Sequence, residues 1–306
     1  MLRLYTHPAC LQHQSATEHV ERPARLEAVL RALDHDRYAA LDRVEAPCAT
    51  REQLLRVHAA THVDAILSAT ASHGECMLDA DTYFCAASPE AALRAAGAVI
   101  AAVGAVLAGH CDKAFCAVRP PGHHATRTQA MGFCLFNNVA LGAAHALAHF
   151  GLNRVAIADF DVHHGNGTQD IFAREPRIMF ASSHQSPLYP DSGGEDECGV
   201  GNIVNGTLAP GAGSHAFRAL WNDVLLPRLY AFRPQLVLIS AGFDAHRCDP
   251  LADLQLDRGD YTWITTQLVA LARAHAQGRL VSTLEGGYDL AALADSVSAH
   301  VSALLQ

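Results

Sequence analysis

A short apolar run followed at once by carboxylates and imidazoles restricts the fold of this chain more than any other feature. Residues 155–158 are apolar and partly β-branched, which predicts a buried strand. Two aspartates and two histidines follow between residues 159 and 164, and Gly165 then lets the chain turn sharply. Because ligands bind at the carboxyl ends of strands in an open α/β sheet, this pattern predicts both a fold class and the place of a site.

Three further segments repeat this pattern. Each is a short apolar run, then small residues, then a polar side chain capable of chemistry: 114–118 before 119–124, 236–239 before 240–246, and 280–284 before 285–288. One such strand end would be a weak signal. Four in one chain can converge on a single pocket.

The residue types at the first strand end indicate a metal site. Asp161 and His163 are two residues apart, so on an extended strand end their side chains point the same way. One oxygen and one nitrogen donor are two of the three protein ligands that a catalytic zinc site needs. By chemistry alone the third could be Asp159, His164, Asp244 or His246. His164 follows His163 directly, so we expect it to point away and to pack as a histidine bonded to backbone.

Taken together, these motifs resemble the zinc-dependent histone deacetylase superfamily, and specifically its class II-like bacterial deacetylases and amidohydrolases. The likeness covers nearly the whole chain and is carried by 21–26, 119–124, 132–134, 159–167, 240–250 and 285–288. It implies an α/β fold of the arginase/deacetylase type, with a mostly parallel eight-stranded sheet flanked by helices. No linker is evident, so we expect a single catalytic domain over residues 1–306.

The local patterns agree with this architecture. We expect strands at 2–6, 41–46, 114–118, 154–159, 178–182, 202–207, 236–240 and 280–284. We expect helices at 22–33, 51–57, 61–72, 88–109, 137–150, 165–173, 215–230, 259–277 and 289–304. Residues 7–21 and 74–87 are predicted to be irregular loops beside the site, of the kind that often carries substrate recognition.

The resemblance also assigns roles to residues. It completes the metal site with Asp244, so that Asp161, His163 and Asp244 bind Zn²⁺, with Fe²⁺ as the alternative. His124 becomes the proton shuttle, His123 its electrostatic partner, and Tyr288 the hydrogen-bond donor to the oxyanion. His123 is paired with Asp159 and His124 with Asn166. Class I enzymes have an aspartate at the position of Asn166, so here His124 should be more readily neutral.

A substrate tunnel and a second ion follow from the same comparison. Phe133 and Tyr189 resemble the aromatic pair that encloses an acyl-lysine chain, with Gly132 and Leu251 completing the wall. Tyr189 stands where phenylalanine is common. A structural K⁺ is implied at Asp159, Asp161, His163 and Ser182.

The function expected is hydrolysis of acyl groups from lysine side chains by a metal-activated water. The first alternative is an acetylpolyamine amidohydrolase, which the apolar Leu251 at the presumed rim disfavours. The second is an inactive acyl-lysine binding module, which would lack a ligand or the tyrosine. An arginase-like binuclear manganese site would need more clustered carboxylates than this chain offers.

Composition limits the partners and the compartment. The net charge of −9 argues against a nucleic-acid backbone and suits acylated lysine peptides, acylated proteins or small acylated amines. Nine scattered cysteines without a Cys-x-x-Cys pair favour a reducing, cytoplasmic location. The longest apolar run, 95–109, is shorter than the ~20 residues of a membrane span, so we expect no membrane association. A homo-oligomer is allowed by these observations.

Overall fold

Eight parallel strands form the centre of the molecule. The computed structural model describes residues 1–15, 18–69 and 75–306. The sheet has the order β2-β1-β5-β10-β9-β6-β7-β8, and every neighbouring pair is parallel. Its strands are β1 (Leu2–Thr6), β2 (Asp42–Glu45), β5 (Lys113–Cys116), β6 (Val155–Asp159), β7 (Ile178–Gln185), β8 (Ile203–Leu208), β9 (Leu236–Ala241) and β10 (Leu280–Leu284). The predicted parallel α/β architecture is therefore confirmed.

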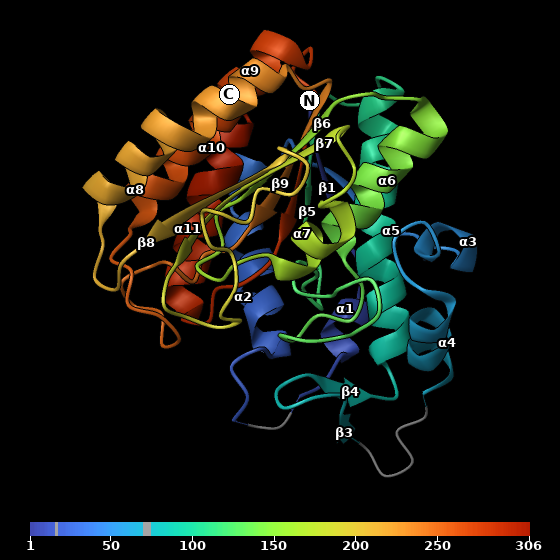
Figure 1. Cartoon of the computed structure of the whole chain (residues 1–306). Helices are drawn as coiled ribbons and strands as arrows, with labels where there is room; N and C mark the ends of the chain where they lie inside the picture. Colours follow the sequence, from blue (N-terminus) through green and yellow to red (C-terminus); the bar gives the residue numbers. More distant parts are fainter. Residues whose placement is uncertain (16–17, 70–74) are drawn as a thin grey trace.

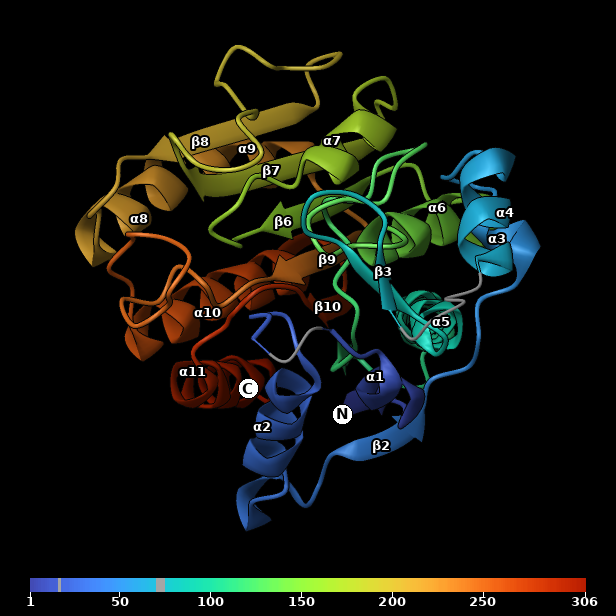
Figure 2. The same ribbon diagram turned by 90° about the horizontal axis from the view of Figure 1, so that it is seen from below.

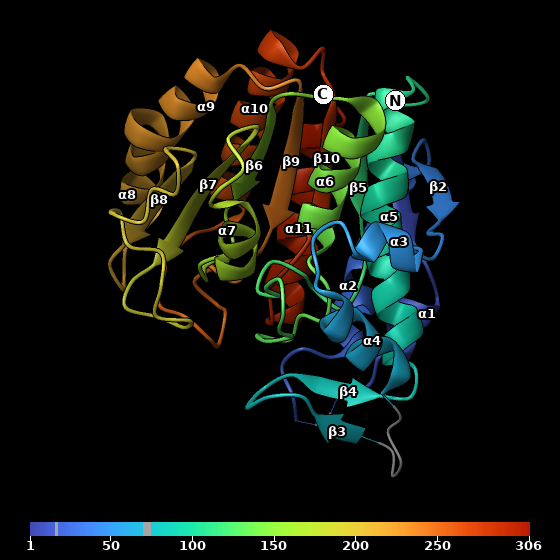
Figure 3. The same ribbon diagram turned by 45° about the vertical axis from the view of Figure 1, so that its right-hand side comes forward.

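Helices cover both faces of this sheet, as a parallel sheet requires. Figures 1 and 3 show α5 and α6 on one side, and α8 to α11 with α2 on the other. The helices are α1 (Ala9–Gln12), α2 (Pro23–Leu33), α3 (Arg51–Leu54), α4 (Ala60–Ser68), α5 (Ser88–Leu107), α6 (Asn138–Phe150), α7 (Asn166–Phe172), α8 (Ser214–Leu220), α9 (Leu226–Phe232), α10 (Arg258–His275) and α11 (Leu290–Leu304). A 3-10 turn (Asp36–Tyr38) and a π-helical turn (Trp221–Leu225) complete the set.

The structure differs from the sequence expectations in the two segments predicted to be loops. The segment 74–87 contains an antiparallel hairpin of β3 (Glu75–Met77) and β4 (Tyr83–Cys85), and 7–21 contains the one-turn helix α1. Both elements are too short to leave a periodic pattern in the sequence. Residues 16–17, and residues 70–74 at the end of the predicted helix 61–72, lie outside the described residues.

The helix predicted at 215–230 is interrupted. A π-helical turn separates α8 from α9, and Trp221 within it is fully buried. The Trp221 Nε1 group donates to Ser183 Oγ on β7 over 3.0 Å. The turn thus satisfies a buried indole N–H, a tertiary requirement that helical periodicity does not reveal.

Helix α5 begins at Ser88, as predicted, and ends at Leu107, two residues before the expected end at residue 109. It has 20 residues and, among the helices described, is long and apolar enough by length and composition to cross a membrane. Two thirds of its apolar window (67%) is buried inside the protein. Such burial is typical of a core helix, and α5 indeed packs along β1, β5 and β10.

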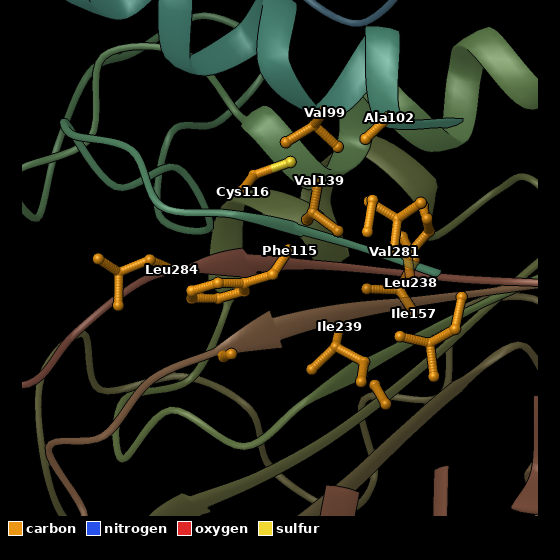
Figure 4. Packing of buried hydrophobic residues seen from close by; sticks show 14 of the residues in the cluster. Val99, Ala102, Phe115, Cys116, Val139, Ile157, Leu238, Ile239, Val281 and Leu284 are labelled. Atoms are coloured by element: carbon orange, nitrogen blue, oxygen red, sulfur yellow. The ribbon is translucent and has the colours of Figure 1, made fainter. Parts of the chain in front are cut away.

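The core lies between these layers. Figure 4 shows Val99 of α5 and Val139 of α6 beside Cys116 of β5 and Val281 of β10, all of them buried. Strands β6, β7, β9 and β10 are buried along their whole length. Each fully buried aliphatic side chain contributes about 1.5–3 kcal/mol relative to an exposed one. The sheet therefore holds its strand ends in fixed positions.

The order of the strands decides where a site can form. The chain leaves β5, passes two strand positions to β6, continues outward to β8, and then returns to place β9 beside β6 and β10 beside β5. The carboxyl ends of β5, β10, β9 and β6 are consequently neighbours. They face the side of the molecule where the β3–β4 hairpin lies, opposite the chain termini (Figures 2 and 3).

Candidate active site

The four neighbouring strands deliver the side chains that the sequence singled out. From the ends of β5, β10, β9 and β6 the chain continues into 119–124, 285–288, 242–246 and 159–164. Nearly all residues of these segments are buried. Polar groups that converge inside a protein must find partners, so the hydrogen bonds and charges between them define the site.

Asp161, His163 and Asp244 form the centre of this site. Each offers one ligand atom, and these atoms all lie within 4.8 Å of one another. His163 Nδ1 is 3.1 Å from Asp161 Oδ1 and 3.2 Å from Asp244 Oδ2. Backbone N–H groups orient both carboxylates: Gly286 donates to Asp161 over 2.8 Å, and Val162 donates to Asp244 over 2.9 Å.

The cluster fits a divalent cation. Asp244 Oδ2 is buried and, among the described residues, receives no hydrogen bond. Burial and the neighbouring Asp161 raise the pKa of Asp244. Burial opposes the charged form of His163, yet the two carboxylates beside it raise its pKa to about 10. A cation between the two carboxylates would therefore be stabilised electrostatically. The donor set of two carboxylate oxygens and one imidazole nitrogen suits Zn²⁺ or Fe²⁺.

Two of the side chains that could have been ligands point elsewhere. His164 is hydrogen-bonded to Ser192 Oγ (2.8 Å) and to Gln169 Oε1 (3.0 Å). The expectation that His164 bonds to backbone is therefore wrong, because two polar side chains from later segments reach its ring. His246 accepts a hydrogen bond from the backbone N–H of Cys248 over 3.1 Å and remains partly exposed.

The two histidines after β5 have the partners that the sequence comparison paired with them. His123 Nδ1 lies 3.0 Å from Asp159 Oδ2, so Asp159 is engaged there rather than in the metal cluster. His124 Nδ1 lies 2.7 Å from Asn166 Oδ1. The two rings are 4.0 Å apart between centroids. An amide oxygen accepts a hydrogen bond and cannot donate one, so Asn166 favours the tautomer of His124 that carries hydrogen on Nδ1.

Their environments drive the two histidines to opposite charge states. Burial opposes the imidazolium of His123, but Asp159 and Asp161 raise its pKa to about 10. Burial and the neighbouring His123 and His163 lower the pKa of His124 well below its usual value. His123 is thus a buried cation, and His124 is a neutral base beside it.

Tyr288 stands at the end of a turn that is fixed by a buried arginine. Arg25 donates to the backbone carbonyls of Gly287 (2.5 Å) and Glu285 (2.6 Å), and its guanidinium lies 4.7 Å from the Tyr288 ring centroid. Burial raises the pKa of the Tyr288 phenol well above its usual value. The phenol therefore remains a proton donor.

Two buried acids were part of the motifs but received no role from the sequence. Glu285 accepts from the backbone N–H groups of Gly122 (2.6 Å) and His123 (3.2 Å), and it lies 3.2 Å from Ser240 Oγ. Burial raises the pKa of Glu285 to about 7. Its place directly after a buried strand was the available signal. The Glu285 side chain thus binds the backbone of the segment that carries His123 and His124. Its neighbours in sequence, residues 286–288, form the turn that ends at Tyr288, called the tyrosine turn below.

The second acid, Glu21, forms ion pairs with two buried arginines. It accepts two bonds from Arg119 (2.5 and 2.6 Å) and one from Arg25 (2.9 Å). All three side chains are almost completely buried. A buried charge without a partner costs several kcal/mol, so Glu21 makes it feasible for Arg25 to reach the tyrosine turn.

A cavity of about 250 Å³ opens onto these groups. Its lining comprises Asp81, His124, Gly132, Phe133, His163, Leu188, Tyr189, Leu251 and Tyr288. All four residues predicted to form a tunnel are among them, and the structure adds Asp81 and Leu188. Tyr189 packs edge-on against His124 at 5.3 Å, and Phe133 against Tyr288 at 5.9 Å. The cavity is thus lined by apolar and aromatic side chains together with Asp81, His124 and His163.

The residues named for potassium are also neighbours. Asp159 and Ser182 are paired across β6 and β7, and Asp161 and His163 follow β6 directly. Ser182 Oγ lies 3.0 Å from His184 Nδ1. Potassium binding stays a prediction.

Known proteins share this sequence and fold. The histone deacetylase domain matches residues 19–304. A probable deacetylase of Archaeoglobus fulgidus is 38% identical, over 93% of this chain and 80% of its own length. A histone deacetylase-like amidohydrolase of Pseudomonas aeruginosa is 41% identical, over 91% of this chain and 74% of its own. The crystal structure of the HDA15 HD domain superposes with a TM-score of 0.94 at 36% identity, covering 99% of this chain and 88% of that one.

Proposed function

This chain belongs to the histone deacetylase family of deacetylases and amidohydrolases, and we propose that it is a zinc-dependent enzyme that removes acyl groups from lysine side chains. One observation carries the proposal. A three-ligand metal cluster, a neutral histidine and a protonated tyrosine lie together, and His163 of the cluster, His124 and Tyr288 line one cavity. Metal-assisted amide hydrolysis can use all three: a Lewis acid, a general base and an oxyanion donor.

Asp161, His163 and Asp244 would hold the ion, through the atoms that converge between them. A bound divalent ion supplies Lewis acidity towards the amide carbonyl and acidifies water for attack. The residues of the chain supply the orientation. Backbone N–H groups of Gly286 and Val162 fix the two carboxylates before any ligand arrives, which reduces the cost of ordering the site.

His124 would move the proton. Asn166 holds hydrogen on its Nδ1, which leaves the Nε2 lone pair free to take a proton from the attacking water. The same nitrogen can return a proton to the leaving amine. The cationic His123 lowers the pKa of His124 and so favours proton release at that second step.

Tyr288 would stabilise the negative charge that develops on the carbonyl oxygen. Its phenol lines the cavity together with His124 and His163. A hydrogen bond that strengthens only as charge develops lowers the barrier without tightening substrate binding. Loss of one such donor typically costs on the order of 10²–10³ in rate.

The walls of the cavity favour a lysine side chain. Phe133, Tyr189 and Leu251 offer apolar surface to a methylene chain, and Leu251 offers no acid to a distal ammonium of a polyamine, whereas Asp81 in the same lining could offer one. An acetylpolyamine therefore remains the second candidate. An inactive binding module is disfavoured because the ligand set and Tyr288 are all present.

A substrate panel on the purified zinc-loaded protein tests the proposal. Acetyl-lysine peptides, longer acyl-lysine peptides and acetylpolyamines are compared by kcat/KM, and Tyr288→Phe serves as the matched inactive control. We expect acyl-lysine peptides to be preferred. A preference for acetylpolyamines above about tenfold, or roughly 1.4 kcal/mol, would replace the first candidate by the second. No turnover of either class would refute amidohydrolase function.

The structural K⁺ and a cytoplasmic location are proposals on separate grounds. Asp159 and Ser182 lie side by side next to the metal cluster, where carboxylate and hydroxyl oxygens could bind a monovalent ion. All nine cysteines are free thiols, as a reducing compartment would leave them.

A further inference from the structure

One carboxylate joins the rim of the cavity to the tyrosine turn. Asp249 lies in the segment after β9, and its side chain is 9% exposed. Its Oδ2 accepts a hydrogen bond from the backbone N–H of Tyr288 over 2.7 Å. Its Oδ1 accepts from the backbone N–H of Leu251 over 3.1 Å. The two oxygens thus hold backbone from two different strand ends.

Other hydrogen bonds hold the residues before Tyr288: Gly286 donates to Asp161 and accepts from the backbone N–H of Phe243. Gly286 and Gly287 precede Tyr288, and Gly287 adopts a φ of +120°, which few side chains tolerate. Arg25 holds the carbonyl of Gly287. Asp249 accepts from the N–H of Tyr288. The peptide group between Gly287 and Tyr288 is therefore fixed at both polar atoms, its carbonyl by Arg25 and its N–H by Asp249.

We propose that Asp249 is a positioning residue that sets the distance between the Tyr288 hydroxyl and the Leu251 rim, and thereby the reach of the acyl-lysine side chain into the site. The inference rests on the proposed function. The inference adds that one carboxylate, Asp249, determines both the alignment of the Tyr288 hydroxyl and the depth of the cavity below Leu251.

Asp249 is held at this position by hydrogen bonds to its side chain. Burial and the nearby Asp244 raise its pKa to about 7, and the N–H groups of Tyr288 and Leu251 act against that rise. Two N–H groups could be satisfied more cheaply by a neutral oxygen or by water. A carboxylate, however, accepts both bonds in a fixed geometry, which suits a positioning role.

A double-mutant cycle tests the proposal. Asp249→Ala, Tyr288→Phe and the combined variant are assayed for kcat and KM with an acetyl-lysine peptide. Asp249→Ala should lower kcat about 10- to 100-fold, because a misplaced catalytic group costs on that order. In the Tyr288→Phe background the same change should lower kcat less than about twofold, while a rise in KM from the displaced Leu251 should persist.

Three controls accompany the cycle. Asp249→Asn keeps one accepting oxygen and should recover part of kcat. Asp253→Ala removes an exposed side chain from the same loop. Among the described residues the Asp253 carboxylate has no hydrogen-bond partner, and its backbone N–H donates to Gln185. This variant should therefore behave as wild type. Metal content and thermal unfolding of each variant show whether the site and the fold are intact.

The outcomes separate this inference from the proposed function. An equal fold-loss of kcat in both backgrounds would overturn it, because Asp249 would then act independently of Tyr288. If the wild type hydrolyses no acyl amine, amide hydrogen exchange still decides the positional claim. Residues 285–289 should exchange faster in Asp249→Ala than in wild type or Asp253→Ala, and unchanged exchange there would refute it.

Discussion

Gly132→Ala offers the sharpest test of how the catalytic histidine is held. Gly132 has a φ of +55°, and a Cβ at this position would lie 2.4 Å from Cδ2 of His124. Ordinary van der Waals contact requires a separation above 3.4 Å, so the imidazole must shift by about 1 Å. That movement is enough to break the 2.7 Å hydrogen bond between His124 and Asn166.

The expected magnitude has two parts that a matched control separates. A left-handed backbone costs a residue with a Cβ about 1–2 kcal/mol. Gly151, the C-cap of α6, has a φ of +65° with nothing within 4 Å of its added Cβ. Gly151→Ala should therefore show only that cost, a fall in Tm of a few degrees, with kcat/KM unchanged.

Gly132→Ala should show a larger fall in Tm, because the clash with His124 adds to the backbone cost, and also a loss of about 10²-fold in kcat/KM, because a shift of 1 Å in a catalytic group has that effect. The assay is steady-state hydrolysis of an acetyl-lysine peptide, with metal content measured on the same samples. If Gly132→Ala retained more than about a third of wild-type kcat/KM while losing stability like Gly151→Ala, the contact with His124 would not govern catalysis, and our reasoning would be refuted.

Four further substitutions address the remaining roles. Asp244→Asn should abolish stoichiometric zinc binding and raise the Tm of the metal-free protein, because it removes a carboxylate whose pKa burial has raised; full zinc content by metal analysis would contradict the ligand assignment. Tyr288→Phe should lower kcat about 10²–10³-fold with little change in KM, and a change confined to KM would make Tyr288 a packing residue. Asn166→Asp should raise the pKa of His124, whose neutral form is the active base, so the acidic limb of the pH–rate profile should move to higher pH; an unmoved limb would refute this. Leu251→Glu should increase kcat/KM for acetylated polyamines relative to acetyl-lysine peptides by a factor equivalent to about 1 kcal/mol, and added salt should reduce this increase.

The sequence predicts the sheet well because each strand carries its own signal. All eight strands of the sheet lie within three residues of the expected positions. Apolar runs buried on both faces mark β6, β7, β9 and β10 locally, whereas β2 is a half-exposed edge strand. The hairpin of β3 and β4 and the helix α1 were missed, because elements of three or four residues are too short for a strand or helix period to repeat visibly.

The residues of the candidate site could be predicted from the sequence, but most of the hydrogen bonds between them could not. Asp161 and His163 follow from spacing, and Asp244 came only from the family resemblance, since chemistry alone allowed His246 as well. The pairings of Glu285 with the histidine segment and of Asp249 with Tyr288 join residues that are far apart in the chain. Such contacts depend on strand order, which no local pattern encodes.

The balance of buried charge explains why these connections exist. Asp159, Asp161, Asp244 and Glu285 lie together under the cavity, and each is almost inaccessible to water. The imidazolium of His123 and the proton on His163 offset part of this negative charge, yet burial still raises the pKa of Asp244 and of Glu285. An uncompensated buried charge costs several kcal/mol, so the fold tolerates these acids at the expense of stability. A divalent cation between Asp161 and Asp244 would supply the missing positive charge, which makes the metal part of the electrostatic balance of the folded state as well as of the proposed chemistry.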